Sequence, residues 1–189
     1  AQQPQPAGSA FKIIPNSELV FSPGCIGFDP VHFVNQHGGF LGEYEEEVDG
    51  QIRSGAEIVE RVSWQYSVNP RLLLALLEYQ SGWVFSSSGV DKGSYPIGFI
   101  TPGYEGLHRQ LSWAADILNQ GYYRWRAGWN GPYIFSSGDT AYIAPGLNAG
   151  TVAVQHLFTQ LYEPDVWREV ISAESFYRTY YAMFGSPYI

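Results

Sequence analysis

The sequence predicts a mainly α-helical protein with little or no β-sheet. The first observation is a run of apolar residues between 71 and 80 that would surround a helix on every side, as in a central, buried helix. The second is a set of segments whose apolar residues recur every three or four positions, which is the periodicity of amphipathic helices. The third is the scarcity of the alternating apolar and polar residues that are typical of half-buried strands.

The N-terminal part is expected to be extended and the rest to form one domain. Residues 1–28 contain a short Pro/Gln-rich leader and then an arm with Pro15 and Pro23, and a single helical domain is expected over residues 29–189. The leader looks like what remains after a signal peptide is removed, which favours a secreted or cell-surface bacterial protein. An artificially shortened N-terminus is the alternative.

Helix starts are marked by a capping residue followed by Pro, or by Glu three positions later: Asp29-Pro30, Ser54 with Glu57, and Asn69-Pro70. The short helix from residue 30 should end at Gly38-Gly39. Later helices are expected over residues 106–120, 151–162, from 164, and over 172–184, with room for small hairpins near residues 133–135 and 142–143. The acidic run over residues 43–49 is expected to be a solvated face.

Composition narrows the class of ligand. Aromatic residues make up 16% of the chain, more than a core alone requires, and many have polar tips that suit a groove for carbohydrate or for proline-rich peptide. The net charge of −8 and the lack of a basic run disfavour nucleic acid and anionic membranes. Because no apolar stretch reaches the length of a membrane-spanning helix, membrane insertion is not expected either. A monomer is expected.

The candidate catalytic residues lie at the end of the buried helix. A carboxyl group at Glu78 would be partly desolvated and would face the negative end of the helix dipole, and both effects favour the protonated form that a general acid needs. The alternative is a helix-end residue whose carboxylate reaches solvent or an arginine. Residue chemistry alone leaves the two interpretations even.

The segment from Tyr66 to Gly82, with Asn69-Pro70 before the leucine run and Gln80-Ser81-Gly82 at its end, resembles the catalytic-helix motif of goose-type lysozymes and soluble lytic transglycosylases. Residues 96–99 (PIGF) and 147–150 (LNAG) are similar to later motifs of that family. The region 106–126 also resembles lysozyme-like regions that precede zinc-peptidase domains in secreted bacterial proteins. The resemblance implies a lysozyme-like fold around the central helix and activity on a β-1,4-linked polysaccharide, with peptidoglycan the first choice and chitin or cellulose as alternatives.

The sequence departs from the family at the acid itself. The family's general acid precedes the Ser, and that position is Gln80 here, whereas Glu78 lies about 200° away around the helix. Three hypotheses follow: Glu78 is the acid of a divergent glycoside hydrolase, Gln80 is an introduced change, or the domain binds glycan without cutting it. Residues expected to bind substrate are Ser81, Trp83, Tyr95, Phe99, Tyr104, Glu105, Trp125 and Asn148.

No other chemistry stands out. The histidines are scattered, so no metal site is expected, and no motif indicates a cofactor. Cys25 is expected to be an inert thiol. Trp64 and Trp113 lie inside helical patterns and are expected in the core.

Overall fold

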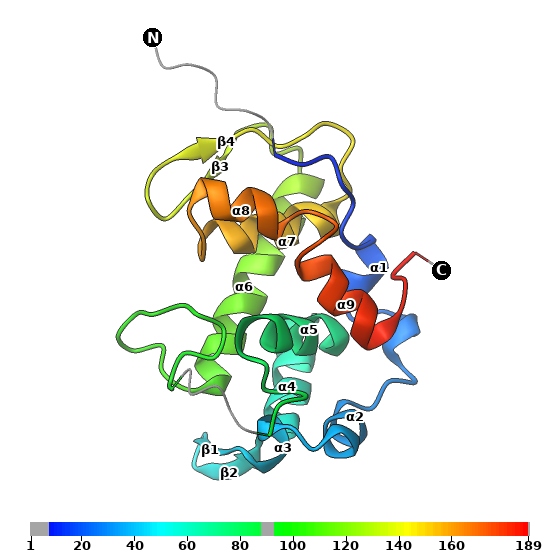
Figure 1. Ribbon diagram of the computed structural model, residues 1–189, viewed down its shortest axis with the longest axis vertical. Coiled ribbons are helices and arrows are strands. Elements are labelled where there is room, and N and C mark those ends of the chain that lie inside the picture. The colour runs from blue at the N-terminus through cyan, green and yellow to red at the C-terminus, as the bar shows by residue number, and fades with distance from the viewer. Residues whose placement is uncertain (1–7, 88–92, 189) are drawn as a thin grey trace. The chain divides into compact units, whose positions relative to one another are not determined.

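The computed structural model describes residues 8–87 and 93–188, and it is mainly α-helical with two short two-stranded sheets (Figure 1). The predicted fold class is thereby confirmed. The chain divides into two compact units: unit 1 comprises Ala1–Asn16 and Ile117–Ile189, and unit 2 comprises Ser17–Asp116. The prediction of a single domain over residues 29–189 stays a prediction. No helix in the described ranges is long and apolar enough to cross a membrane.

Unit 2 is built around the predicted central helix. In order along the chain it contains the end of α1 (Asn16–Leu19), a 3-10 turn (Pro23–Cys25), α2 (Pro30–His37), α3 (Phe40–Glu43), β1 (Glu45–Val48), β2 (Gln51–Ser54), α4 (Gly55–Tyr66), α5 (Pro70–Ser81) and the start of α6 (Leu107–Arg126). The Asn69 side chain caps α5 by accepting the amide of Arg71 at 2.9 Å. Residues 72–77 are fully buried, as the apolar run predicts, and α5 ends at Gly82 in the left-handed conformation.

Unit 1 contains the rest of α6, β3 (Tyr133–Ile134), β4 (Thr140–Ala141), α7 (Ala149–Thr159), α8 (Pro164–Val170) and α9 (Phe176–Phe184). In α7 every residue is buried, so the unit has its own central helix. The described part of the arm, from residue 8, lies along this unit: Ile13 and Ile14 are fully buried, and the Thr151 hydroxyl oxygen accepts the Ile13 amide at 2.9 Å. In α7 itself, burial lowers the pKa of His156 to about 4, and the nearby Arg124 adds to this shift.

The acidic run is largely solvated, as expected, with Glu43, Glu45, Glu47 and Asp49 exposed. It also forms the first strand and the turn of an antiparallel hairpin, β1 with β2, whose turn places Asp49 and Gly50 at positive φ; an Asp-Gly pair is a strong hairpin signal.

Two local predictions need correction. The arm is helical at α1, within the segment expected to be extended. The helix expected to end at residue 120 continues to Arg126, because Gly121 is a close-packing position and not a stop: a Cβ there would lie 2.9 Å from the Ala153 Cα in α7.

One acidic side chain is also not simply solvated. Glu46 Oε2 accepts the backbone amides of Leu107 at 2.7 Å and His108 at 3.3 Å, and so caps the start of α6. The Tyr44 hydroxyl donates to the same oxygen at 2.9 Å. Burial and this carboxylate together raise the pKa of Tyr44 to about 12.

Candidate functional site

The end of α5 places Glu78 and Gln80 in different surroundings. Glu78 Oε2 accepts the backbone amides of Val84 at 2.9 Å and Phe85 at 3.1 Å, so its carboxylate holds the turn that follows the helix. Gln80 is 7% exposed, and its Oε1 lies close to Gly98 in the next loop. Glu78 therefore stabilises the turn after α5, and the Gln80 side-chain amide lies beside the loop that contains Gly98.

Two residues expected to bind substrate at this helix end are buried. Ser81 is 3% exposed and donates its hydroxyl to the Leu77 carbonyl at 2.8 Å. Trp83 is 2% exposed and packs with its ring centroid 4.7 Å from that of Phe40 and 5.1 Å from that of Tyr44. Both side chains belong to the core of unit 2, because the left-handed turn at Gly82 directs the chain back over the helix end.

The loop over residues 93–106 is held in one shape by a buried amide that the sequence analysis missed. Gln110 in α6 is fully buried and donates its Nε2 to the carbonyls of Phe99 at 2.9 Å and Tyr104 at 2.8 Å. Its Oε1 accepts the amides of Ile97 and Phe99, both at 3.3 Å. Because the oxygen and the nitrogen of this one amide group both hold the loop, ligand binding would not carry a large entropy cost for ordering it.

This loop brings together four of the residues expected to bind substrate: Tyr95, Phe99, Tyr104 and Glu105. Phe99 stacks face to face on Trp113 of α6, with centroids 4.0 Å apart and planes 4° from parallel. Tyr104 lies edge-on to Phe99 at 4.9 Å and is 39% exposed. We call Tyr95, Phe99, Tyr104 and Trp113 the aromatic patch. Trp113 is half-buried, so the expectation that it lies in the core is only partly right.

Glu105 is an ionised, structural carboxylate in this arrangement. Its Oε1 accepts the Tyr95 hydroxyl at 2.8 Å and its Oε2 accepts the Gly103 amide at 2.8 Å. Its own backbone amide and then the Tyr95 hydroxyl lower the pKa of Glu105, and the same carboxylate raises the pKa of Tyr95. Neither group is thus prepared to donate a proton near neutral pH.

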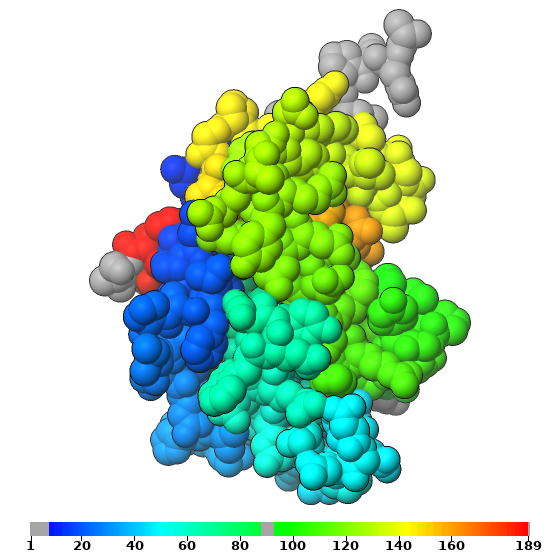
Figure 2. All heavy atoms as spheres, turned by 180° about the vertical axis from the view of Figure 1, so that it is seen from behind, coloured from blue at the N-terminus to red at the C-terminus, as the bar shows by residue number. Residues whose placement is uncertain are grey.

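Beside the patch is a shallow hollow of about 330 Å³, lined by Tyr66, Gly103, Tyr104, His108, Arg109, Ser112, Trp113 and Asp116. Its lining includes the indole of Trp113, the imidazole of His108, the guanidinium of Arg109 and the carboxylate of Asp116. Burial lowers the pKa of His108, so the imidazole is neutral at physiological pH and able to donate or accept a hydrogen bond. In Figure 2 the loop forms a projecting lobe of the surface, in green.

The last two residues expected to bind substrate lie in unit 1 and are engaged within it. Trp125 donates its Nε1 to the Leu147 carbonyl at 2.9 Å. Asn148 donates its Nδ2 to the Ile14 carbonyl at 2.6 Å and accepts the Thr151 hydroxyl at 2.9 Å, so it fastens the N-terminal arm to the start of α7. The structure therefore supplies a different explanation for the Asn-Ala-Gly sequence, since Gly150 also makes room for the Pro15 carbonyl.

The carboxylates and possible metal ligands of the described residues are the groups that a hydrolytic site would use. Within residues 8–87 and 93–188 no cluster of His, Cys, Asp or Glu could hold a metal ion. The two carboxylates that the sequence analysis placed near the substrate, Glu78 and Glu105, both accept pairs of hydrogen bonds from the protein itself. Gln110 and Trp113 were within reach of the sequence analysis, because both lie one helical turn apart on the α6 face that meets the loop.

Comparison with known proteins gives one family. The family model described as the N-terminal domain of LasA matches residues 12–189, so the chain belongs to this family. In LasA-type proteins, which are secreted bacterial proteins, this domain precedes a peptidase domain. No curated protein and no solved structure matches the chain.

Proposed function

For this member of the LasA N-terminal-domain family, we propose a non-catalytic glycan-binding module that accompanies a secreted bacterial cell-wall peptidase. The single observation that carries the proposal is the end of α5. The position that resembles the lysozyme-type acid is Gln80, whose side chain is an amide. The carboxylate of the nearby Glu78 already accepts hydrogen bonds from the backbone N–H groups of Val84 and Phe85. A general acid must hold a proton and release it to the leaving group, which an amide does not do.

Support for binding comes from the aromatic patch. Sugar rings have apolar C–H faces that pack on aromatic rings, while their hydroxyls need hydrogen-bond partners at the edge. Trp113 and Tyr104 supply the rings, and His108, Arg109 and Asp116 supply polar groups around the same hollow. Since Gln110 already fixes the loop, binding does not have to order it. Peptidoglycan is the proposed glycan, because the domain precedes a peptidase in secreted bacterial proteins.

The lysozyme-like relationship is part of the same proposal. It is supported by the buried helix that starts at Asn69-Pro70 and ends at Ser81-Gly82, with the loop around Gly98 beside Gln80. In this proposal the scaffold keeps the substrate-facing loop and has lost the acid. Fold alone does not fix the activity, so the activity has to be measured.

The test combines binding and product release. The chain should bind insoluble peptidoglycan saturably, with no reducing ends or anhydro products detected by mass spectrometry. Tyr104→Ala should weaken binding about 2–10-fold, as expected for the loss of one stacking ring worth about 0.5–1.5 kcal/mol. Tyr142→Ala, which changes an exposed tyrosine of unit 1, is the matched control and should bind as the parent does.

The outcomes separate the alternatives. Product release by the parent chain would contradict the proposal and restore a divergent hydrolase, with Glu78→Gln the next variant to assay. Release only by Gln80→Glu would support a lysozyme-type site that has been disarmed. Chitin oligomers and cellulose, tested in the same way, decide whether peptidoglycan is the glycan. Failure to bind any of the three would contradict the glycan-binding proposal.

A second candidate is favoured by the family's place in the chain. A domain that precedes a peptidase domain is present at high effective concentration and can bind that domain even with low intrinsic affinity. In this case the isolated chain, added to a LasA-type peptidase domain, should change its peptidase activity or its refolding yield. Peptidase activity and refolding yield that both stay unchanged at a saturating concentration of the chain would rule this candidate out.

A further inference from the structure

A second hollow in unit 2 lies between α4 and the segment over residues 21–30. It measures about 250 Å³, and its walls include Phe21, Ile26, Phe28, Asp29, Glu60 and Trp64. Sites for drug-sized molecules usually occupy roughly 300–1,000 Å³, so this hollow has room for one long side chain and little more. None of the residues of the aromatic patch lines it.

The rim of this hollow is unusually apolar for an exposed surface. Trp64 is 69% exposed, Ile26 is 77% exposed and Phe21 is 39% exposed, and the rings of Phe21 and Trp64 meet edge-on at 6.5 Å. The expectation that Trp64 lies in the core is wrong. It stands about 200° around α4 from the buried Val62, so the helix turns it to solvent, and Figure 2 shows α4, in teal, at the surface. Exposed apolar groups that gather in this way mark binding surfaces.

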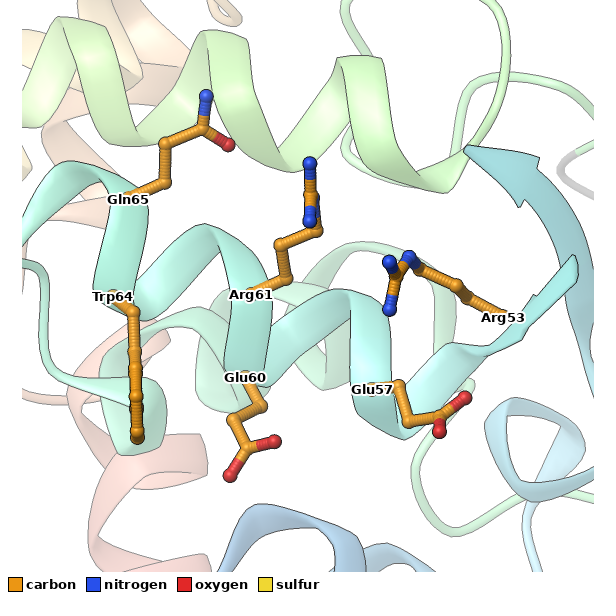
Figure 3. A pocket seen from close by; sticks show the side chains of 6 residues that line it. All are labelled: Arg53, Glu57, Glu60, Arg61, Trp64 and Gln65. Atoms are coloured by element: carbon orange, nitrogen blue, oxygen red, sulfur yellow. The ribbon is translucent and has the colours of Figure 1, made fainter. Parts of the chain in front are cut away.

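The charge at the rim is negative. Glu60 lies one turn before Trp64, and in Figure 3 the two side chains point to the same side of α4, whereas Arg61 and Gln65 point to the other. Among the residues that the structure describes, the Glu60 carboxylate has neither an ion pair nor a hydrogen bond. Asp29 adds a second carboxylate and accepts the His32 amide at 2.9 Å.

Two nearby arginines, Arg71 and Arg61, are already paired with carboxylates. Arg71 lies over the Phe28 ring, 5.8 Å from its centroid, but it is paired with Glu18 at 3.2 Å and donates to the Gly24 carbonyl. Arg61 is paired with Asp49. The hollow therefore combines an indole face with acidic groups, and a cation satisfies both features at once.

We propose that this hollow binds an arginine side chain of an apolar, basic peptide segment. A guanidinium stacks on an aromatic face more readily than an ammonium does, because it is planar and weakly hydrated, and its N–H groups match the geometry of a carboxylate. The Trp64 indole would stack on the guanidinium, Glu60 would accept its hydrogen bonds, and an adjacent aliphatic residue would cover Ile26. This inference goes beyond glycan binding and rests on different residues.

Nuclear magnetic resonance titration of the ¹⁵N-labelled chain tests the proposal, with the indole N–H signals as the readout. Trp64→Ala identifies the Trp64 signal among those of the six tryptophans. The probe is acetyl-Leu-Arg-amide, and its control is acetyl-Leu-citrulline-amide, which keeps the shape and removes the charge. We expect the arginine peptide to shift the Trp64 signal and the citrulline peptide to leave it unchanged at the same concentration.

Two matched variants test the carboxylate. Glu60→Gln should weaken binding of the arginine peptide about 2–5-fold, from the loss of one partly exposed charge pair. Glu57→Gln removes the same charge one turn earlier, outside this hollow, and should leave the affinity unchanged because Gln also serves in the capping box.

Equal shifts with both peptides, or equal weakening in both variants, would overturn the proposal. So would sedimentation that shows a dimer of the chain dissociated by Trp64→Ala, since the hollow would then bind a second copy. A lysine peptide that binds more tightly than the arginine peptide would also contradict it.

Discussion

Replacing Gln110 by Met tests whether this one side chain shapes the aromatic patch. Met has nearly the same length and keeps the buried volume filled, but it removes all four hydrogen bonds to the loop. A net contribution of about 0.5–1.5 kcal/mol per bond, with the two 3.3 Å bonds at the weak end, gives a loss of about 2–4 kcal/mol. For a chain of this length, that corresponds to a fall in Tm of roughly 4–16 °C.

Thermal and urea unfolding of the purified variant measure the loss, with Gln65→Ala as the control. Gln65 is exposed on α4, so its substitution should change stability by less than about 0.5 kcal/mol. The Gln110→Met variant should also bind peptidoglycan more weakly, because Phe99 and Tyr104 are no longer fixed by their carbonyls. A Tm within about 2 °C of the parent, which corresponds to about 1 kcal/mol or less, together with unchanged binding would refute the idea that Gln110 organises the site.

Three further substitutions test local interactions. Because the folded pKa of His156, about 4, is below its unfolded value, the unfolded state binds more protons as pH falls from about 6.5 to 4, and stability is lost over that window; His156→Gln should flatten this part of the urea-unfolding pH profile by up to about 3 kcal/mol. Glu46→Gln should lower stability by about 1–2 kcal/mol through the weakened cap of α6, whereas Glu47→Gln, exposed on the same strand, should have little effect in the same assay. In Gly39→Ala the added Cβ would lie 2.1 Å from a backbone carbonyl oxygen, so poor soluble yield or a Tm drop of more than about 6 °C is expected; Gly27→Ala, with nothing within 4 Å, should fold normally.

The parts of the fold that could be predicted are those determined by local sequence. Asn69-Pro70 and the capping box at Ser54 and Glu57 act within one turn, so each helix start is visible in a short window. Gly121 shows the opposite case. A glycine after an amphipathic run resembles a helix end. Only the close approach of α7 shows that this position is glycine because there is no room for a side chain.

The candidate site was harder to predict, because the identity of an aromatic residue does not show whether its side chain is buried or exposed. Trp83 was expected to face substrate but is buried, after the turn at Gly82. Trp64 was expected in the core but is exposed, because of its angular position on α4. Counting about 200° from Val62 would have placed Trp64 correctly, since α4 has one apolar face. Burying Trp83 requires Phe40 and Tyr44, which lie much earlier in the chain, to pack against it at the end of α5, and no local pattern shows this.

The register of α5 supports the proposal that this helix end binds glycan without cleaving it. Residues 78 and 80 point about 200° apart, so only one of them can face the loop around Gly98, and that one is Gln80. Glu78 faces the turn, where the backbone amides of Val84 and Phe85 both donate to its Oε2. If the proposal holds, a catalytic site at this helix end would require a carboxyl at position 80, with Glu78 left in place. The informative comparison is thus Gln80→Glu against the parent, because a change at Glu78 alters the turn as well as the chemistry.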